Sequence, residues 1–441
     1  MKCLILAAGR GSRLRQRAES KPLLPVLGVP LIERTLRTAL AAGVEECVVV
    51  TGHAGEAVRN RLAHLSRRLG VPVRTVHNPA WEHAENGRSV LAAEDLLDAP
   101  FLLMMADHLV EPALVTTLLA SPPPPDGIAL AVDGDLDNPL VDPDDVTRVR
   151  RREGAIEAIG KGLEPFDGYD TGVFLCTPAL FDALREVEDT RLTAAVAHLA
   201  RQGRVRAVDV TGRFWCDVDD AAALERAERA LLARLRGKPT DGPVARWLNR
   251  PLSIRITRHL VRYPVTPNQI SLFAFALSVL AAALFLAGGR GGLALGGVLA
   301  QAASIIDGCD GEVARLKYLQ SDYGGWLDAV LDRYADALLL FGLTWYQWST
   351  TPSHPGYVLA TGFAAIIGSF MLSYTADKYD HRMQARILRG GRAGLRLGRD
   401  VRVLLVFLAA LTGLVFPVLL LIALAMNAEV VRRLFLVRGE D

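Results

Sequence analysis

The stretch that decides the fold of the second half of the chain is residues 307–332, which read DGCDGEVARLKYLQSDYGGWLDAVLD. It contains four aspartates, Asp307, Asp310, Asp328 and Asp332, and apolar segments long enough to cross a membrane flank it. A charge at membrane depth is costly, so such residues usually belong to a substrate or ion path. The sequence therefore predicts a functional site inside a membrane-spanning domain.

The four aspartates are paired at helical spacing. Asp307 and Asp310 are three residues apart and Asp328 and Asp332 are four apart, so each pair can share one face of a helix. Four converging carboxylates repel each other and lose hydration, and the single Arg315 cannot balance them. Cations resolve this conflict, because two divalent metals can clamp a diphosphate for in-line displacement. The alternative interpretation is a salt-bridged helix cap.

The complete spacing, D-x2-D-G-x2-A-R-x8-G-x3-D-x3-D, resembles the signature of the CDP-alcohol phosphotransferases. These membrane enzymes displace CMP from a CDP-linked alcohol and use two divalent metals. The resemblance implies that Asp307, Asp310 and Asp328 ligate metal. It implies that Asp332 completes the cluster and is the base for the acceptor hydroxyl. It also implies that three further residues of the signature form part of the CDP pocket: Gly311, Ala314 and Arg315.

Apolar runs predict six membrane spans, at about residues 268–288, 292–307, 325–347, 355–377, 400–414 and 416–433. Lys and Arg in short loops mark the cytoplasmic side. The loop from Lys378 to Arg402 holds eight Lys or Arg residues, whereas the short loops on the other side hold only Arg290. The sequence therefore predicts a multi-pass protein of the cell membrane whose termini, soluble half and aspartate stretch all face the cytoplasm.

The basic residues near the cytoplasmic ends of the fourth and fifth spans have two interpretations. The acceptor pocket of the CDP-alcohol phosphotransferases, which this half resembles, is usually basic. An acceptor that carries its own phosphate can therefore be bound by Lys378, Arg399 and Arg402. Arginines near helical spacing also suit a face that attracts anionic lipid headgroups. The pocket is favoured for Arg399 and Arg402. The lipid face is favoured for the other arginines that recur near helical spacing: Arg382, Arg386, Arg389 and Arg396.

The composition changes near residue 250, where a mixture of charged and apolar residues gives way to long apolar runs. A polar break at 237–242 is the predicted domain boundary. The segment after it mixes Trp247 and several arginines with apolar residues, which is typical of a helix in the membrane interface. Three parts are therefore predicted: a soluble domain over 1–236, an interfacial linker over 237–267 and a transmembrane domain over 268–441.

The N-terminal half alternates predicted strands and helices. Lys2–Ala7 is a short apolar run, a glycine-rich turn follows at 9–13, and a periodic helix follows around Leu31–Ala42. Together with the apolar run Cys47–Thr51, this order predicts a doubly wound, Rossmann-like α/β fold. A glycine-rich turn after the first strand lets backbone N–H groups approach a phosphate, although an ordinary tight turn has the same composition.

The extended motif, LILAAGRGSRL followed by KPLLPVLGVPLIE, resembles the nucleotidyltransferases that couple an NTP to a sugar phosphate or a phospho-alcohol. The resemblance implies that Ala7, Gly9, Gly11 and Arg13 contribute to binding the nucleotide and its triphosphate. It implies that Lys21 neutralises charge on the reacting phosphates. The alternative for Lys21 is a solvated surface lysine.

Carboxylates predict a Mg²⁺ site in this half, because Mg²⁺ prefers oxygen ligands. Asp107 ends the apolar run FLLMMAD, and ligands of α/β sheets bind at the carboxyl ends of strands. Asp217 and Asp219 alternate along a later strand and share one face, and which of them binds metal stays open. An exposed acidic turn is the alternative. The histidines have no metal-ligand spacing and are interpreted as ordinary residues: His53, His83 and His108.

Three further positions carry the resemblance to substrate-binding residues. Asn86 lies where relatives contact base or ribose. Lys161 and Asp170, in IGKGLEPFDGYDTGVFL, resemble the acceptor-binding segment of inositol-1-phosphate cytidylyltransferases.

The two halves are chemically coherent, because a cytidylyltransferase makes the CDP-alcohol that the second half consumes. Their order resembles the bifunctional inositol-1-phosphate cytidylyltransferase/di-myo-inositol phosphate phosphate synthase family. The resemblance implies that CTP and inositol 1-phosphate give CDP-inositol and pyrophosphate. CDP-inositol and a second inositol 1-phosphate would then give phosphorylated di-inositol phosphate and CMP. It implies one Mg²⁺ in the soluble domain, two divalent metals (Mg²⁺ or Mn²⁺) in the membrane domain, and a homodimer formed through the membrane domain.

Two alternatives differ from this function. A fused pair of the same enzyme types can use another phospho-alcohol or a lipid acceptor. A degenerate pair can serve as a membrane scaffold or transporter, although the intact motifs in both halves argue against that. Nothing in the sequence predicts a nucleic-acid partner.

Overall fold

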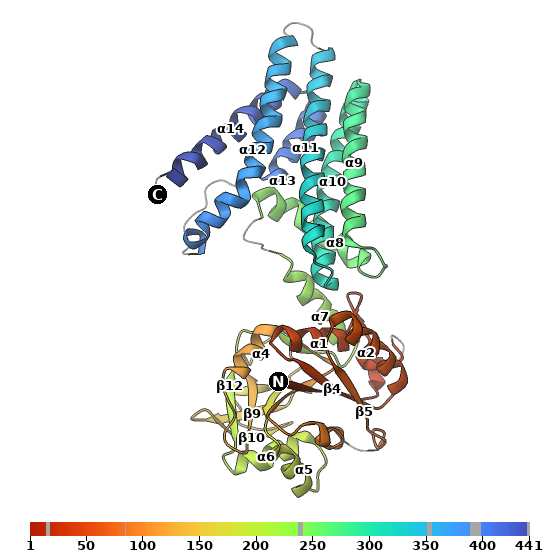
Figure 1. Cartoon of the computed structure of the whole chain (residues 1–441), viewed down its shortest axis with the longest axis vertical. Helices are drawn as coiled ribbons and strands as arrows, with labels where there is room; N and C mark the ends of the chain where they lie inside the picture. The colour runs from red at the N-terminus through yellow and green to blue at the C-terminus, as the bar shows by residue number, and fades with distance from the viewer. Residues whose placement is uncertain (15–17, 84, 237–240, 351–354, 389–397, 439–441) are drawn as a thin grey trace. The chain divides into compact units, whose positions relative to one another are not determined.

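The computed structural model describes the chain except for residues 15–17, 84, 237–240, 351–354, 389–397 and 439–441. The side chains of Ser12 and of residues 376–388 and 436–438 also lie outside the described part. The chain divides into two compact units, Met1–Ala230 and Leu231–Asp441, and each is described by itself (Figure 1).

A nine-stranded mixed sheet forms the centre of the first unit. In spatial order its strands are β5 (Val73–His77), β4 (Glu46–Thr51), β1 (Lys2–Ala7), β6 (Phe101–Met105), β11 (Gly168–Cys176), β8 (Ile128–Asp133), β12 (Val205–Asp209), β10 (Ala155–Gly160) and β9 (Arg148–Arg152). The first four run parallel, and β11 is antiparallel to both β6 and β8. The carboxyl ends of β5, β4, β1 and β6 therefore meet at one edge, which is where ligands of such sheets bind.

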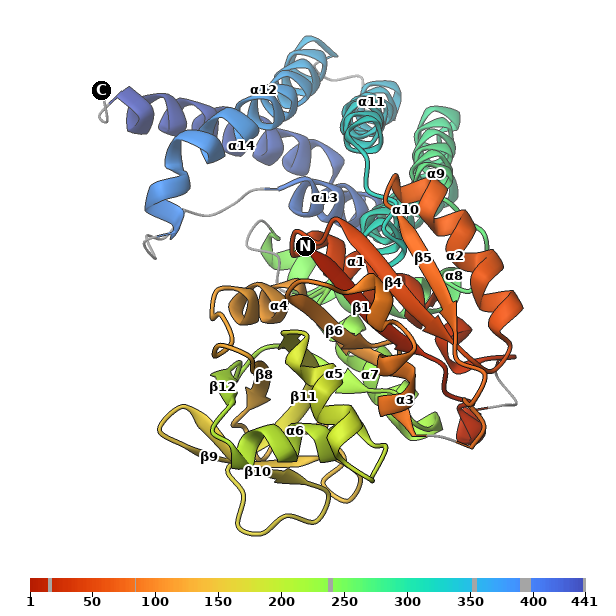
Figure 2. The ribbon, with the colours of Figure 1, turned by 60° about the horizontal axis from the view of Figure 1, so that its bottom comes forward.

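Helices cover both faces of this sheet (Figure 2). One face carries α1 (Leu31–Ala41), α2 (Gly55–Leu69) and α4 (Pro112–Leu119), and the other carries α3 (Asn86–Leu91), α5 (Ala179–Glu186) and α6 (Leu192–Arg201). Successive side chains of a strand point to opposite faces. Cys3 and Ile5 therefore pack under α1, α2 and α4, whereas Leu4 and Leu6 pack under α3, α5 and α6. The predicted α/β fold is confirmed.

A small antiparallel pair lies beside the main sheet. It joins β7 (His108–Val110) to β13 (Trp215–Asp217), in a register that sets Asp217 opposite His108. The remaining elements of this unit are η1 (Ser12–Leu14), η2 (Lys21–Leu23), β2 (Pro25–Val26), β3 (Val29–Pro30), η3 (Glu94–Leu96) and α7 (Ala221–Ala233), whose last residues belong to the second unit. The β7–β13 pairing brings a segment near residue 217 to the end of β6.

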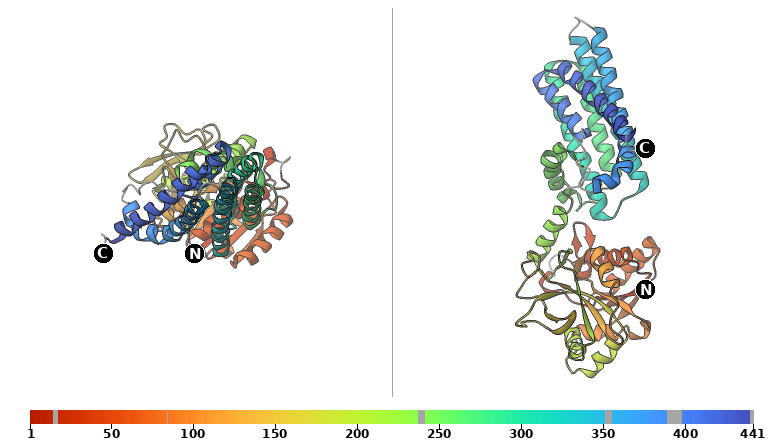
Figure 3. Two further views of the ribbon diagram at one scale, coloured as in Figure 1. Left: turned by 90° about the horizontal axis from the view of Figure 1, so that it is seen from above. Right: turned by 90° about the vertical axis from the view of Figure 1, so that its left-hand side faces the viewer.

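The second unit is helical (Figure 3). Its elements are η4 (Ala245–Asn249), α8 (Arg250–Leu260), α9 (Pro267–Ala287), α10 (Arg290–Lys317), α11 (Asp322–Thr350), α12 (Pro355–Leu388), α13 (Arg399–Thr412) and α14 (Val415–Arg438). Within the described residues, four helical segments are long and apolar enough to cross a membrane: Pro267–Ala287, Arg290–Lys317, Pro355–Thr375 and Val415–Phe435.

The other two predicted spans correspond to α11 and α13, which fall short of that criterion for different reasons. α11 has 29 residues but carries charged side chains along its first half. The 14 residues of α13 extend only about 21 Å, against roughly 30 Å for the hydrocarbon core of a bilayer. The second span was predicted to end at residue 307, and α10 itself continues as a helix to Lys317. The apolar run stops at residue 307, but the helix does not, since Glu312 is buried against polar partners on α8.

α10 lies at the centre of the helical unit, where it packs against α8, α9 and α13. Gly297 of α10 faces Ala410 of α13 so closely that a side chain at Gly297 would collide with it. Small residues of this kind let helix backbones approach each other, and van der Waals packing then holds helices together in a membrane. The apolar core includes Phe285, Leu340 and Leu419.

Candidate active sites

Lys21 is the cation at the centre of the first site. Its ammonium donates hydrogen bonds to Asp107 Oδ2 at 2.7 Å and to Asp219, and it lies 3.9 Å from Asp217 Oδ1. Gly11, at φ +60°, packs against the Lys21 side chain, and a Cβ there would collide with it. Only 9% of the Lys21 side chain is exposed, so the alternative of a solvated surface lysine is wrong.

The surroundings stabilise the ionised forms of Lys21 and Asp107 but not that of Asp217. Burial favours the neutral amine, but the fields of Asp107, Asp217 and Asp219 raise the pKa of Lys21 well above its usual range. Burial opposes ionisation of Asp107 as well, yet the Lys21 charge lowers the pKa of that carboxyl to about 2. At Asp217 burial dominates and raises the pKa to about 7. Asp217 therefore gains most from a further cation, which would stabilise its ionised form.

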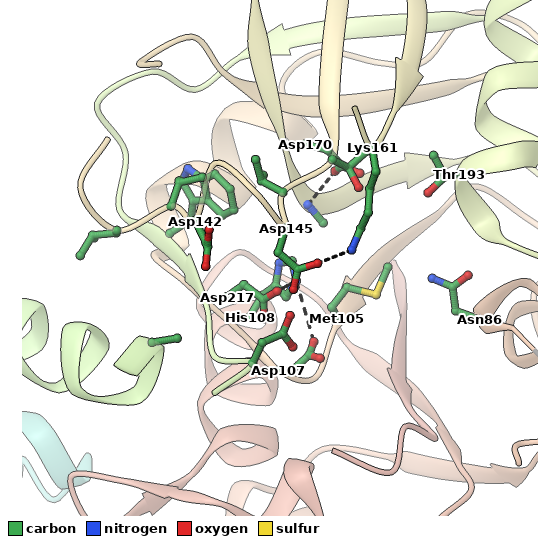
Figure 4. Close-up of a pocket in the computed structure, with 18 of the residues that line it drawn as sticks. Asn86, Met105, Asp107, His108, Asp142, Asp145, Lys161, Asp170, Thr193 and Asp217 are labelled. Carbon is green, nitrogen blue, oxygen red and sulfur yellow. Dashed lines mark hydrogen bonds and ion pairs between the residues drawn. The ribbon is translucent and has the colours of Figure 1, made fainter. Parts of the chain in front are cut away.

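Asp107, His108 and Asp217 form a group that can hold a metal, since one ligand atom from each lies within 4.8 Å of the others. His108 Nδ1 is 2.8 Å from the Thr171 carbonyl, which leaves Nε2 facing Asp217 Oδ2 at 3.7 Å and Asp107 Oδ1 at 3.9 Å (Figure 4). Two carboxylates with one imidazole fit Mg²⁺ or Mn²⁺. The structure thus places His108, which was interpreted from the sequence as an ordinary residue, in a group that can hold a metal.

A buried hydrogen bond ties β13 to the main sheet just before Asp217. The indole Nε1 of Trp215 donates to Asp133 Oδ2 at 2.8 Å, and Trp215 and Asp133 are 2% and 0% exposed. Asp133, at the end of β8, also accepts hydrogen bonds from Asn138 Nδ2 and the Asp135 backbone N–H. This hydrogen bond fixes Trp215, and with it the nearby Asp217 on the same strand, relative to the central sheet.

The same pocket continues to a second set of charged residues. Asp145 accepts a hydrogen bond from Lys161 Nζ at 2.6 Å and another from Arg13 Nη1 at 3.0 Å, and these two bonds lower its pKa. Asp170 is half-buried in the same pocket, and loss of hydration raises its pKa to about 6. Arg13 lines the pocket that contains Asp107 and Asp217. Lys161, Asp170 and Asn86 line it as well (Figure 4). Cationic side chains drawn together by one carboxylate form a ready site for phosphate oxygens.

The second site lies where α10 and α11 meet. Asp307 of α10 and Asp328 and Asp332 of α11 place carboxylate oxygens within 4.8 Å of one another, which is the second group that can hold metal. Asp310 is one turn along α10, where it accepts a hydrogen bond from Ser271 Oγ at 2.6 Å. A purely oxygen donor set suits a hard divalent cation such as Mg²⁺ or Mn²⁺. The helix-cap alternative is excluded, because the four residues lie within helices rather than at their ends.

Arg399, at the start of α13, reaches this cluster. Its Nη1 lies 2.8 Å from Asp307 Oδ2 and 2.8 Å from Asp332 Oδ1. No other cationic side chain of the described residues is ion-paired with Asp307 or Asp332. Arg399 and Arg402 were both predicted to bind the acceptor. The structure brings Arg399 to the aspartate cluster, and acceptor binding by either residue stays a prediction. Arg402 itself is 4% exposed, and its guanidinium contacts Asp336 and Ser373.

A pocket opens beside Asp310 and Asp328, between α9, α10 and the start of α11. Gly311, Ala314 and Arg315, the residues predicted to contact CDP, all line it. The Nη2 atom of Arg315 is buried and has no hydrogen-bond partner. An unpaired buried guanidinium nitrogen is costly, so a ligand with acceptor atoms would complete it.

Beyond this pocket, a row of buried polar contacts fixes the juxtamembrane helix α8 to α10. Glu312, which is 0% exposed, accepts hydrogen bonds from Ser253 Oγ at 2.6 Å, Thr257 Oγ1 at 2.7 Å and Arg250 Nη1 at 2.9 Å. Arg250 is held in turn by Asp241. Residues two apart on a helix point in nearly opposite directions. Glu312 therefore anchors α10 to α8 on the side of the helix opposite Asp310.

Two family profiles match the chain: a MobA-like NTP transferase domain over residues 3–204 and a CDP-alcohol phosphatidyltransferase over residues 264–433. A protein of Rubrobacter xylanophilus, described as a bifunctional IPC transferase and DIPP synthase, is 42% identical over 99% of this chain and 97% of its own length. The chain belongs to this bifunctional family. A relative of the same description from Aquifex aeolicus is 31% identical over 98% of this chain and 97% of its own length.

Solved structures align with about half of the chain. The inositol-1-phosphate CTP transferase from T. maritima aligns with 25% identity and a TM-score of 0.47, over 52% of this chain and 94% of that structure.

Most of the predicted site residues gather in the two sites. Gly9 and Gly11 do not line the pocket around Asp107, and Ala7 is buried at the end of β1, so their contact with nucleotide stays a prediction. The side chain of Lys378 lies outside the described residues. Asp219 bonds to Lys21 and is absent from the metal group of described residues.

Three residues at these sites were missed from the sequence: His108, Asp145 and Asp336. The first had a signal, because it directly follows Asp107 at the end of a strand. Asp145 belongs to an acidic loop with no motif, and only its contacts with Arg13 and Lys161 distinguish it. Asp336 continues the four-residue spacing of Asp328 and Asp332 by one more turn, which the family signature does not include.

Replacing Trp215 with phenylalanine should weaken metal binding at the first site. The ring is kept, but Asp133 loses a buried donor, which costs about 2 kcal/mol of unfolding free energy. We expect the Mg²⁺ concentration for half-maximal pyrophosphate release to rise about tenfold, because support for Asp217 is lost. The rate at saturating Mg²⁺ should stay close to wild type. A lower saturating rate with an unchanged Mg²⁺ requirement would contradict this role.

Proposed function

We propose that the chain catalyses two consecutive transfers. CTP and inositol 1-phosphate give CDP-inositol and pyrophosphate in the first unit, and CDP-inositol and a second inositol 1-phosphate give phosphorylated di-inositol phosphate and CMP in the second. The observation that carries the proposal is one chain with an acidic cluster in each unit and similarity to bifunctional relatives over almost its whole length.

In the first reaction a phosphate oxygen of inositol 1-phosphate attacks the α-phosphorus of CTP, and the bond to pyrophosphate breaks. Lys21 would stabilise the negative charge that develops on the transferred group. Asp107 and Asp217, beside His108, would hold a Mg²⁺ or Mn²⁺ ion, and that ion would supply further positive charge there. Arg13 and Lys161 would give up their hydrogen bonds to Asp145 and donate to the phosphates of the substrates instead.

In the second reaction an acceptor hydroxyl attacks the phosphorus of CDP-inositol that carries the inositol, and the bond to CMP breaks. Asp332 would take the proton from that hydroxyl, because it lies in the cluster with Asp307 and Asp328. Two divalent cations held by this cluster and by Asp310 would offset the charge of the diphosphate. The unpaired nitrogen of Arg315 is available to the CDP group.

The same proposal includes the membrane arrangement. The four apolar helices support a multi-pass membrane protein. With the more polar α11 and the shorter α13 as two further spans, the number becomes six, and both termini and both sites lie in the cytoplasm. The exposed Trp247, on η4, suits a linker that lies in the membrane interface. The domain limits 1–236, 237–267 and 268–441, and a homodimer through the membrane domain, belong to this proposal.

The deciding experiment gives the purified full-length protein CTP, Mg²⁺ and labelled inositol 1-phosphate. We expect labelled CDP-inositol with pyrophosphate first, and then a water-soluble phosphodiester with release of CMP. Reactions without CTP should give neither product. Failure to form CDP-inositol would contradict the substrate assignment. A second product that extracts into organic solvent when lipids are added would favour a lipid acceptor instead.

A further inference from the structure

Asp336 is a buried carboxylate next to the second site that the family signature does not include. It lies on α11, four residues after Asp332 and eight after Asp328, so the three side chains share one face of the helix. Its side chain is 5% exposed. It is not part of the group formed by Asp307, Asp328 and Asp332.

Asp336 joins three helices. Its Oδ2 accepts hydrogen bonds from Arg402 Nη2 of α13 at 2.6 Å and from Ser369 Oγ of α12 at 3.2 Å. Its Oδ1 accepts from Arg399 Nε of α13 at 3.3 Å. Arg402 alone would balance the charge of Asp336, so the contact with Arg399 needs another explanation.

Arg399 has two ends with different partners. Its Nε edge rests on Asp336, while Nη1 lies 2.8 Å from Asp307 and 2.8 Å from Asp332. A guanidinium is planar and rigid, so fixing its Nε edge also fixes where its Nη groups point. Asp336 thereby directs the Nη1 end of Arg399 toward the carboxylate proposed as the base.

The charges around Arg399 suggest what replaces its contacts when substrates bind. Asp307 and Asp332 would attract Arg399 less if they held divalent cations, whereas Asp336, which lies outside that group, would keep its charge. The free Nη edge then suits an anion with paired oxygens, such as a phosphate. An acceptor whose hydroxyl is at Asp332 would bring its own phosphate within reach of that edge.

We propose that Asp336 is a positioning residue that holds Arg399 beside Asp332 so that Arg399 receives the phosphate of the acceptor. This inference rests on the proposed second reaction. It implies that the acceptor carries a phosphate. It also implies that Asp336 affects binding of the acceptor and not of the CDP-alcohol, for which the pocket beside Asp310 and Arg315 is proposed.

The test is the Asp336→Asn variant of the full-length protein, supplied with CDP-inositol and inositol 1-phosphate. Asparagine keeps the shape but removes the charge. We expect the KM for inositol 1-phosphate to rise about tenfold or more, while the KM for CDP-inositol stays within about twofold. Inorganic phosphate should inhibit the wild type competitively against inositol 1-phosphate, and this inhibition should weaken in the variant. A purely structural role would not separate the two substrates.

Glu429→Gln is a matched control. Glu429 is a carboxylate of α14 that is 8% exposed and bonded to Arg432 and Arg433, so the variant removes the same charge from a similar setting. It should leave both KM values unchanged. A second variant, Arg399→Lys, keeps the charge but loses the planar fork, and it should also raise the KM for the acceptor alone.

The outcomes are distinguishable. Absence of CMP release by the wild type would overturn the proposed second reaction and this inference with it. CMP release by the wild type, combined with equal changes of both KM values in Asp336→Asn, would overturn the inference alone. If Asp336→Asn does not fold, an unchanged acceptor KM in Arg399→Lys would overturn it as well.

Discussion

Replacing Asp332 with asparagine is expected to abolish CMP release while pyrophosphate release by the first unit continues. Asp332 lies in the cluster with Asp307 and Asp328, so the variant loses both a metal ligand and the proposed base. Loss of a general base alone slows a reaction by roughly 10²–10⁴-fold, and we expect at least about 10³-fold here. The measurement is the rate of CMP release from supplied CDP-inositol, with pyrophosphate release from CTP followed in the same preparation.

Asp322→Asn is the control for this variant. Asp322 lies on the same helix but is exposed, and it is outside the metal group of described residues. The same chemical change there should leave both rates unaltered. Persistent CMP release by Asp332→Asn at saturating metal would show that another group accepts the proton. A parallel loss of pyrophosphate release would point to general misfolding rather than to a lost base.

Replacing Lys21 with methionine should have the reciprocal effect. The ammonium contacts Asp107 and Asp219 and lies close to Asp217, and no other lysine or arginine of the described residues is ion-paired with these carboxylates. Removing one electrostatic stabiliser of a transition state costs about 10²–10³-fold in rate, and we expect a loss of this size in pyrophosphate release. CMP release from supplied CDP-inositol should be unchanged. Both rates can be measured on the same membrane preparation.

The structure adds a second expectation for this variant. Without Lys21 the carboxylates of Asp107, Asp217 and Asp219 repel each other, so the thermal midpoint of the first unit should fall and should recover partly with Mg²⁺. Lys2→Met is the control, because Lys2 is a lysine of the same unit whose side chain is 36% exposed and bonded to Leu96 and Asp98. Wild-type pyrophosphate release by Lys21→Met would refute its role in catalysis.

Much of the fold and of both sites could be predicted from the sequence because the determining residues are local. Asp307 and Asp310 lie on one helix and Asp328 and Asp332 on the next, so spacing alone indicates which side chains share a face. A strand that ends in Asp107 likewise predicts a ligand at the edge of the sheet.

Other features could not be predicted from the sequence. Charged residues end an apolar run at Asp307, but they do not end the helix that contains it. The chain continues as a helix from Asp307 to Lys317, since Glu312 finds three donors on α8 that the sequence does not reveal. His108 had no metal-ligand spacing along the chain. Its partner Asp217 comes from β13, which pairs with β7 across more than a hundred residues.

The sequence by itself determined the two chemistries, the α/β class of the first unit and the membrane character of the second, because these depend on short motifs and on the period of apolar residues. Only the tertiary structure decided which side chains share each site. It placed Asp217 in a group that can hold a metal and Asp219 against Lys21, joined Arg13 and Lys161 through Asp145, and set Arg399 between Asp332 and Asp336. These contacts join residues far apart in the chain, and packing of whole elements, not local spacing, sets their distances.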